Sequence, residues 1–103
     1  MQMDAGLDTG DMLLKSALPI APDETADSLH DKLAAMGGDL LEETLRHLEA
    51  GTITPEKQDG AQAGLYAGMI SKEDGRIDFT RPAAEIERRI RAMTSWPGAF
   101  SYL

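Results

Sequence analysis

The sequence Met3-Asp4-Ala5-Gly6-Leu7-Asp8-Thr9-Gly10-Asp11 runs directly into the apolar residues Met12-Leu13-Leu14. It brings three carboxylates and two glycines close together. That many acidic residues do not suit a buried strand, and that much glycine does not suit a helix. The pattern predicts a tight loop that presents a carboxylate, followed by a strand.

The strand is expected over residues 12–20, where apolar residues dominate and a turn containing Pro22 follows. A helix is expected next, with Asp23 or Thr25 as its cap. Leucine and methionine recur in it at spacings of three and four, which is typical of a helix with one apolar face: Leu29, Leu33, Met36, Leu40, Leu41, Leu45 and Leu48. The pair Gly37-Gly38 predicts a kink or two consecutive helices, and Gly51 predicts the end.

The remainder of the chain shows weaker patterns. Residues 52–75 have the scattered glycines of a linker, and residues 76–79 alternate like a short strand. A second helix is expected with Thr80 as its N-cap and Pro82 in its first turn. Trp96-Pro97-Gly98 then predicts a turn. Residues 99–103 read as the start of a strand, and we expect that the chain is truncated there.

Composition limits the classes of protein that this chain can represent. It has 103 residues, no cysteine and a net charge of −8. Its length suits one domain at most, and disulfides and thiolate metal sites are excluded. The acidic balance argues against a nucleic-acid-binding surface over the whole chain. Nothing in it resembles a signal peptide or a membrane span, so we expect a cytoplasmic protein without membrane contact.

Three segments in this order resemble the methionyl-tRNA formyltransferase family. The first is the opening loop, residues 1–11. The second is Ile70-Ser71-Lys72-Glu73-Asp74-Gly75-Arg76-Ile77-Asp78-Phe79, and the third is Ile90-Arg91-Ala92-Met93-Thr94-Ser95-Trp96-Pro97-Gly98-Ala99-Phe100. The resemblance covers essentially the whole chain.

The resemblance implies an α/β fold class. Residues 1–52 would be the C-terminal part of a Rossmann-like catalytic domain, contributing a strand and a long helix. Residues 53–75 would be a linker. Residues 76–103 would supply the first helix and strand of an OB-like barrel domain. The chain would then be a fragment of the enzyme.

The resemblance also implies an activity. The family transfers a formyl group from 10-formyltetrahydrofolate to the amino group of methionine on initiator tRNA, in translation initiation, and no metal is involved. Its catalytic groups are an asparagine, a histidine and the aspartate of Leu-Asp-Thr-Gly, which is Asp8 here. The asparagine and the histidine would lie upstream of Met1, and most folate-contacting residues would lie outside this chain. We therefore expect the fragment alone to be inactive, and either to self-associate or to be only partly ordered.

Each candidate residue also has a plainer interpretation. Asp8 alone would fit a surface turn. The acidic loop resembles a calcium site only loosely, because Ala5-Gly6-Leu7 interrupts the pattern. His30 and His47 fit a helix surface better than a metal site.

Arginines at positions 81, 88, 89 and 91 could contact tRNA phosphates, or could pair along the helix, as in Glu85–Arg89. Two other functions stay open: a small helical interaction module, and a formyltransferase that acts on an amino sugar nucleotide.

Overall fold

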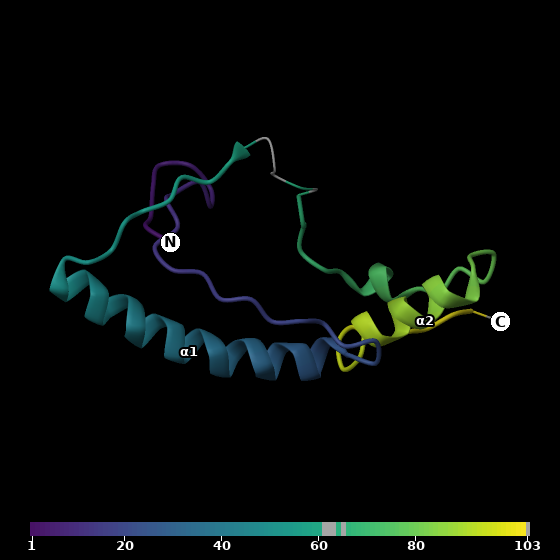
Figure 1. Ribbon diagram of the computed structural model, residues 1–103. Helices are drawn as coiled ribbons and strands as arrows, with labels where there is room; N and C mark the ends of the chain where they lie inside the picture. Colours follow the sequence, from purple (N-terminus) through teal and green to yellow (C-terminus); the bar gives the residue numbers. More distant parts are fainter. Residues whose placement is uncertain (61–63, 65, 103) are drawn as a thin grey trace. The chain divides into compact units, whose positions relative to one another are not determined.

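The computed structural model describes residues 1–60, 64 and 66–102. Two α-helices and one short 3-10 helix have assigned bounds: α1 (Ala26–Ala50), η2 (Lys72–Gly75) and α2 (Ala83–Ala92), shown in Figure 1. The chain divides into two compact units. Unit 1 contains Met1–Leu18 and Ala34–Tyr66, and unit 2 contains Pro19–Leu33 and Ala67–Leu103.

Helix α1 begins where the sequence predicts. The Thr25 side chain accepts a hydrogen bond from the backbone N–H of Ser28 at 3.2 Å, and the Ser28 hydroxyl accepts one from the N–H of Thr25 at 3.0 Å. This reciprocal pair satisfies two backbone donors that the first turn leaves free. Thr25 is therefore the cap, and the alternative of Asp23 is not needed.

The end of α1 is also as predicted. Gly51 has a φ of +66°, its N–H donates to Leu48, and the N–H of Thr52 donates to His47. These two bonds close the last turn in a Schellman motif, whose left-handed residue favours glycine. Between its ends α1 is continuous through Gly37-Gly38, so the prediction of two consecutive helices is wrong.

The glycine pair in α1 gives a stability prediction. A Cβ added at Gly37 would meet no atom within 4 Å. We expect Gly37→Ala to stabilise the helix by about 0.5–1 kcal/mol, because alanine loses less conformational freedom there. Urea unfolding followed by circular dichroism measures the change. The matched control, Gly51→Ala, should destabilise the chain, since its φ is positive; equal shifts in both variants would contradict the account.

The expected strand over residues 12–20 is absent among the described residues. Met12 forms an isolated antiparallel bridge with Glu56, and the two residues exchange backbone hydrogen bonds of 2.8 Å. A strand is stable only where neighbouring strands pair with it along its length, and this segment has one pairing point. The apolar pattern therefore predicts extended backbone correctly but not a strand.

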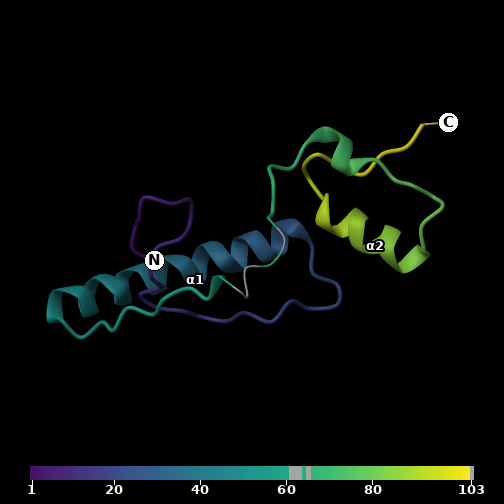
Figure 2. The ribbon, with the colours of Figure 1, turned by 90° about the horizontal axis from the view of Figure 1, so that it is seen from above.

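The expected strands near the C-terminus are likewise reduced to one bridge. Arg76 pairs in parallel with Phe100, and the N–H of Ile77 donates to the Phe100 carbonyl at 2.8 Å. Figure 2 shows the C-terminal segment passing η2 in this way. Leu103, the last residue of the expected strand, lies outside the described residues. The turn at Trp96-Pro97-Gly98 is confirmed, with a cis Trp96–Pro97 bond.

Helix α2 does not use Thr80 as its cap. The backbone N–H and hydroxyl of Thr80 both donate to the Asp78 carboxylate, at 3.0 and 2.7 Å, which lowers the pKa of Asp78. Thr80 thus uses its hydroxyl and its backbone N–H in a local turn before the helix begins, and does not cap the helix. Pro82 is the cap residue, and its carbonyl accepts from Glu85 and Ile86.

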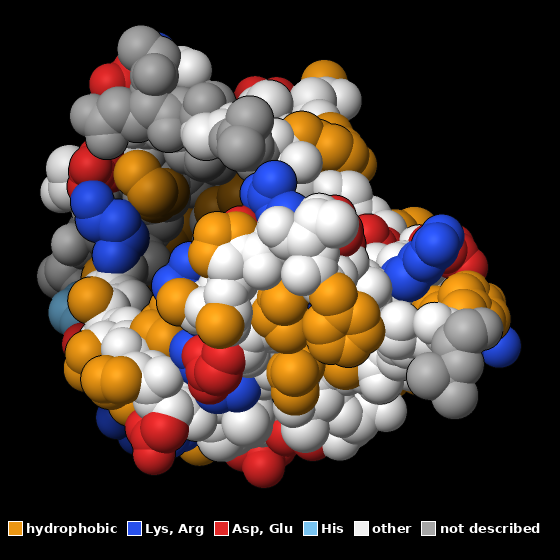
Figure 3. Space-filling view, turned by 90° about the vertical axis from the view of Figure 1, so that its right-hand side faces the viewer, with side chains coloured by type: hydrophobic (Ala, Val, Ile, Leu, Met, Phe, Trp, Pro, Cys, Tyr) orange, Lys and Arg blue, Asp and Glu red, His pale blue; other side chains and the backbone are white. Residues whose placement is uncertain are grey.

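Large hydrophobic side chains are extensively exposed. Ile77 is the one buried hydrophobic residue in the described ranges, while Leu41 and Leu45 on α1 are 59% and 57% exposed. Hydrophobic side chains also gather on the face shown in Figure 3. Burying one large apolar side chain is worth about 1.5–3 kcal/mol, so this surface favours association.

We therefore expect the 103-residue chain to self-associate at micromolar concentration. When two copies associate through the exposed leucines of α1, both copies remove apolar surface from water. Light scattering across a dilution series measures the mass. The variant Leu41→Ser with Leu45→Ser should shift the distribution toward the monomer. A monodisperse monomer that unfolds cooperatively would contradict this expectation.

Candidate active-site loop

The opening residues form a closed loop. The N–H of Gln2 donates to the Asp11 carbonyl at 2.9 Å, which joins the two ends. Gly10 is buried at this closure, and a Cβ there would collide with the Gln2 carbonyl oxygen. Because no side chain fits at that position, glycine is required for the loop to close.

A residue distant in sequence holds the loop. The side-chain amide of Gln58 donates to the carbonyls of Asp8 and Gly10, at 2.8 and 2.7 Å. Asp8 itself is in the left-handed region, with a φ of +53°, a conformation that aspartate tolerates better than most residues. The backbone of Asp8 is thus fixed from a separate segment, while its side chain is exposed.

The sequence does not predict the contacts of Gln58, or those of Glu56 two positions earlier. The Glu56 carboxylate pairs with Lys15 at 2.7 Å, beside the bridge between Glu56 and Met12. These contacts anchor the chain immediately after the loop. The residues that make these contacts are about 40–50 positions apart in the sequence. No spacing rule connects residues at such a distance, so the sequence gives no signal for the contacts.

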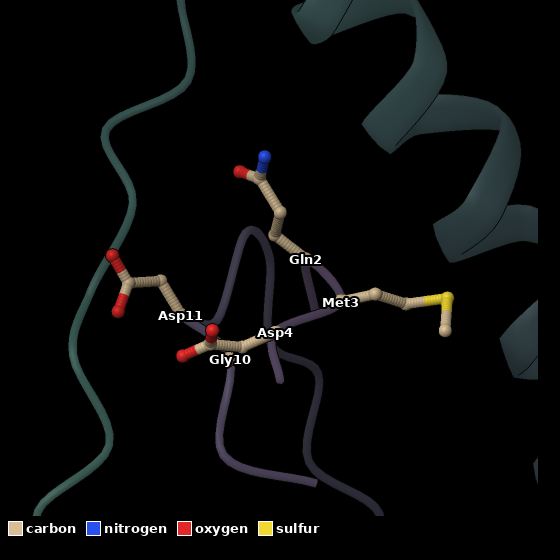
Figure 4. Close-up of a pocket in the computed structure, with 5 residues that line it drawn as sticks. All are labelled: Gln2, Met3, Asp4, Gly10 and Asp11. Carbon is tan, nitrogen blue, oxygen red and sulfur yellow. The ribbon is translucent and has the colours of Figure 1, made fainter. Parts of the chain in front are cut away.

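The loop presents carboxylates on its surface. Gln2, Met3, Asp4, Gly10 and Asp11 line an open pocket, in which the Asp4 and Asp11 side chains extend to one side and Met3 to the other (Figure 4). Asp8 lines a second hollow, together with Met12 and Gln58. Exposed carboxylates of this kind can accept a hydrogen bond from an imidazole N–H and can exchange protons with water.

Within the described ranges, no group of three or more His, Asp or Glu side chains is placed to hold a metal ion. Likewise, no described helix is long and apolar enough to cross a membrane.

Both histidines lie on the surface of α1, as the sequence predicts. His30 is largely exposed, beside Asp31. The ring of His47 lies 2.7 Å from the Thr52 hydroxyl, at the C-terminal end of the helix. A histidine near a helix C-terminus is favourably placed in the helix dipole.

The arginines of the second helix mostly have partners within unit 2. Arg81 pairs with Glu85, Arg91 pairs with Glu87, and Arg89 donates to the Asp74 carbonyl at 2.8 Å. Pairing at a spacing of four residues is therefore confirmed, although Glu85 pairs with Arg81 and not with Arg89. Arg91 donates a hydrogen bond to Glu87, which lowers the pKa of that carboxyl group, and Glu85 raises the pKa of Arg81.

Both ends of the chain match one class of enzyme. Residues 1–45 match the formyl transferase family, and residues 69–103 match the formyl transferase C-terminal domain. The chain belongs to the formyl transferases. Within this class it is similar to methionyl-tRNA formyltransferases, and the resemblance indicated by the three motifs is confirmed.

Three such relatives illustrate the similarity. The methionyl-tRNA formyltransferase of Anaeromyxobacter dehalogenans is 57% identical over 103 residues, 100% of this chain and 33% of the relative. Those of Citrifermentans bemidjiense and Geobacter sulfurreducens are 54% and 52% identical over 103 residues, 100% of this chain and 32% of each relative. The chain therefore spans about a third of the length of these curated relatives.

Proposed function

We propose that this chain contributes to an enzyme that transfers a formyl group from 10-formyltetrahydrofolate to the amino group of methionine on initiator tRNA. The observation that carries the proposal is the loop around Asp8, held by Gln58 and Gly10, within a segment that matches the formyl transferases. The names of the relatives support methionyl-tRNA as the acceptor. They favour this function over an amino sugar nucleotide acceptor or a helical interaction module.

The proposed arrangement of domains follows the same plan. Residues 1–52 would end the catalytic domain, with its Rossmann-like sheet, and residues 53–75 would be the linker. Residues 76–103 would begin the OB-like barrel domain. The separate matches over residues 1–45 and 69–103 support two domains, and the unmatched residues 46–68 between them include the first part of the proposed linker.

The chemistry gives Asp8 a specific role. The methionine nitrogen attacks the formyl carbon, the carbonyl oxygen becomes an oxyanion, and the carbon–nitrogen bond to tetrahydrofolate then breaks. The attacking amine loses one proton and the departing nitrogen gains one. Donors must stabilise the oxyanion, and a positioned acid–base group must move the protons.

We assign to Asp8 the orientation of a histidine and the movement of these protons through water. An exposed side chain on a fixed backbone suits this role, since it can reach a partner group while its position is held. The histidine and the asparagine that donate to the oxyanion would come from other parts of the enzyme. Asp8 is thus one member of a proposed catalytic trio.

A chimera tests the proposed function. The 103 residues replace the aligned segment of the Geobacter sulfurreducens relative, which is 52% identical to them over that length. We expect the chimera to formylate methionyl-tRNA with 10-formyltetrahydrofolate and to leave an amino sugar nucleotide unmodified. The unaltered relative is the control for assay and folding. A folded chimera that fails with methionyl-tRNA, or that prefers the sugar, would contradict the proposal.

A further inference from the structure

Glu24 and Asp27, just before and within the first turn of α1, contact Arg91 near the end of α2 and Ser95 in the turn that follows it. The Arg91 guanidinium donates to the Glu24 carbonyl oxygen at 2.6 Å. The Ser95 hydroxyl donates to the Asp27 carboxylate. Both contacts lie inside unit 2. They join a segment that matches the formyl transferase family to one that matches its C-terminal domain.

Glu24, the residue of this contact that precedes α1, is held by partners of its own. Glu24 is the one buried charged residue in the described part of the chain, and its side chain is 3% exposed. Its carboxylate accepts from Lys32 at 2.7 Å and from the Ser28 hydroxyl, and these bonds lower the pKa of Glu24, with Lys32 as the largest cause. A buried carboxylate is stable only with such partners. The Glu24 side chain is therefore held in one orientation, in the same residue whose backbone carbonyl accepts from Arg91.

The Arg91 side chain is oriented by another residue of α2. Glu87 accepts from the Arg91 guanidinium at 2.5 Å, which raises the pKa of Arg91 and fixes the plane of its donors. The Arg91 side chain is 22% exposed, so the bond to Glu24 is partly shielded from water. Ser95 has a φ of +66° in the turn that follows α2. That turn brings the hydroxyl of Ser95 to Asp27.

We propose that Glu24, Asp27, Arg91 and Ser95 form a clasp that holds the end of α2 against the start of α1 and so fixes the junction between the two formyl transferase segments. The clasp shares no residue with the loop around Asp8. It does not depend on the proposed catalytic function, because it consists of contacts within one compact unit. Its residues act by positioning.

The rate of disulfide formation between two introduced cysteines reports how closely the two parts of the clasp are held. The chain contains no cysteine of its own that could interfere. In Asp27→Cys with Ser95→Cys, the new thiols replace two groups that already touch. A disulfide forms readily when the two Cα atoms lie roughly 4.4–6.8 Å apart. We expect rapid oxidation within one molecule, measured at high dilution. The matched control pairs Ser95→Cys with Asp31→Cys, one turn further along α1, and should oxidise about ten-fold more slowly or not at all.

A third substitution shows whether the hydrogen bond from Arg91 holds positions 27 and 95 together, or whether they are merely close in space. Arg91→Met removes the donor to Glu24, and we expect it to slow disulfide formation between positions 27 and 95 by about ten-fold, as loss of a hydrogen bond from a charged donor does. Arg91→Lys should recover part of the rate. The control is Arg88→Met on the same helix, because the Arg88 side chain forms no hydrogen bond with another described residue.

Circular dichroism shows whether each variant keeps its helices. Equal oxidation of the 27–95 and 31–95 pairs in folded chains would overturn the proposal. Equal effects of Arg88→Met and Arg91→Met would also overturn it.

Discussion

The 103-residue chain by itself is expected to transfer no formyl group from 10-formyltetrahydrofolate to methionyl-tRNA above the rate in buffer. Stabilising the oxyanion is often the largest single contribution to catalysis of this kind, and removing one donor costs about 10²–10³-fold. The chain contains no asparagine. His30 and His47 both lie on α1, neither of them among the residues that line the hollow beside Asp8. In the described part of the chain, Asp8 therefore has neither an asparagine nor a histidine beside it.

The assay compares the isolated chain with the chimera at equal molar concentration. The chimera supplies the asparagine and histidine from the relative, so its activity shows that the 103 residues are competent once those groups are present. Turnover by the isolated chain would mean that groups other than the proposed trio perform the transfer. It would remove the main reason for the assignment of Asp8.

The second large effect is expected for Asp8→Asn in the chimera, which should lower kcat by about 10²–10⁴-fold. Asparagine keeps the size of the side chain and tolerates the left-handed conformation of this residue. It cannot hold or release the proton. The free energy of unfolding should change by no more than about 0.5 kcal/mol, because the exposed side chain of Asp8 lies outside the hydrogen bonds that close the loop.

A matched substitution on the same loop controls for charge. Asp11→Asn also removes one negative charge, and the contact of Asp11 that closes the loop uses its backbone carbonyl. We expect kcat of this variant to stay within about three-fold of the unaltered chimera, a spread that corresponds to less than 1 kcal/mol. Steady-state kinetics at saturating substrate measure both variants. A near-normal kcat in Asp8→Asn would remove Asp8 from the catalytic role.

The parts of the fold that the sequence predicts are those set by neighbours in the chain. Thr25 and Gly51 bound α1 because capping involves residues only three to five positions apart. At Gly37-Gly38 the sequence allows either a kink or two consecutive helices, and the continuous α1 excludes the second, since two glycines lower helix propensity without forbidding the helix. The sequence predicts Thr80 as a cap, because nothing in the pattern reveals that Thr80 donates its hydrogen bonds to Asp78 instead.

The parts that the sequence does not predict depend on distant residues. Extended backbone at Met12 is visible in its apolar pattern, yet whether it forms a strand depends on partners such as Glu56. In the candidate site, too, some features are predicted from the sequence and others are not. The loop and Asp8 are identified from the motif, whereas the support from Gln58 arises only in the folded chain.

The most direct test of the central claim is a double-mutant cycle in the chimera, between Asp8→Asn and alanine substitution of the relative's catalytic histidine. If Asp8 acts by orienting that histidine, the two groups work as a unit, and their effects on kcat are strongly non-additive. The account predicts that the double variant is about as slow as the histidine variant alone. Losses that multiply, in chimeras that melt like the unaltered one, would show that Asp8 acts independently of the histidine and would contradict the account.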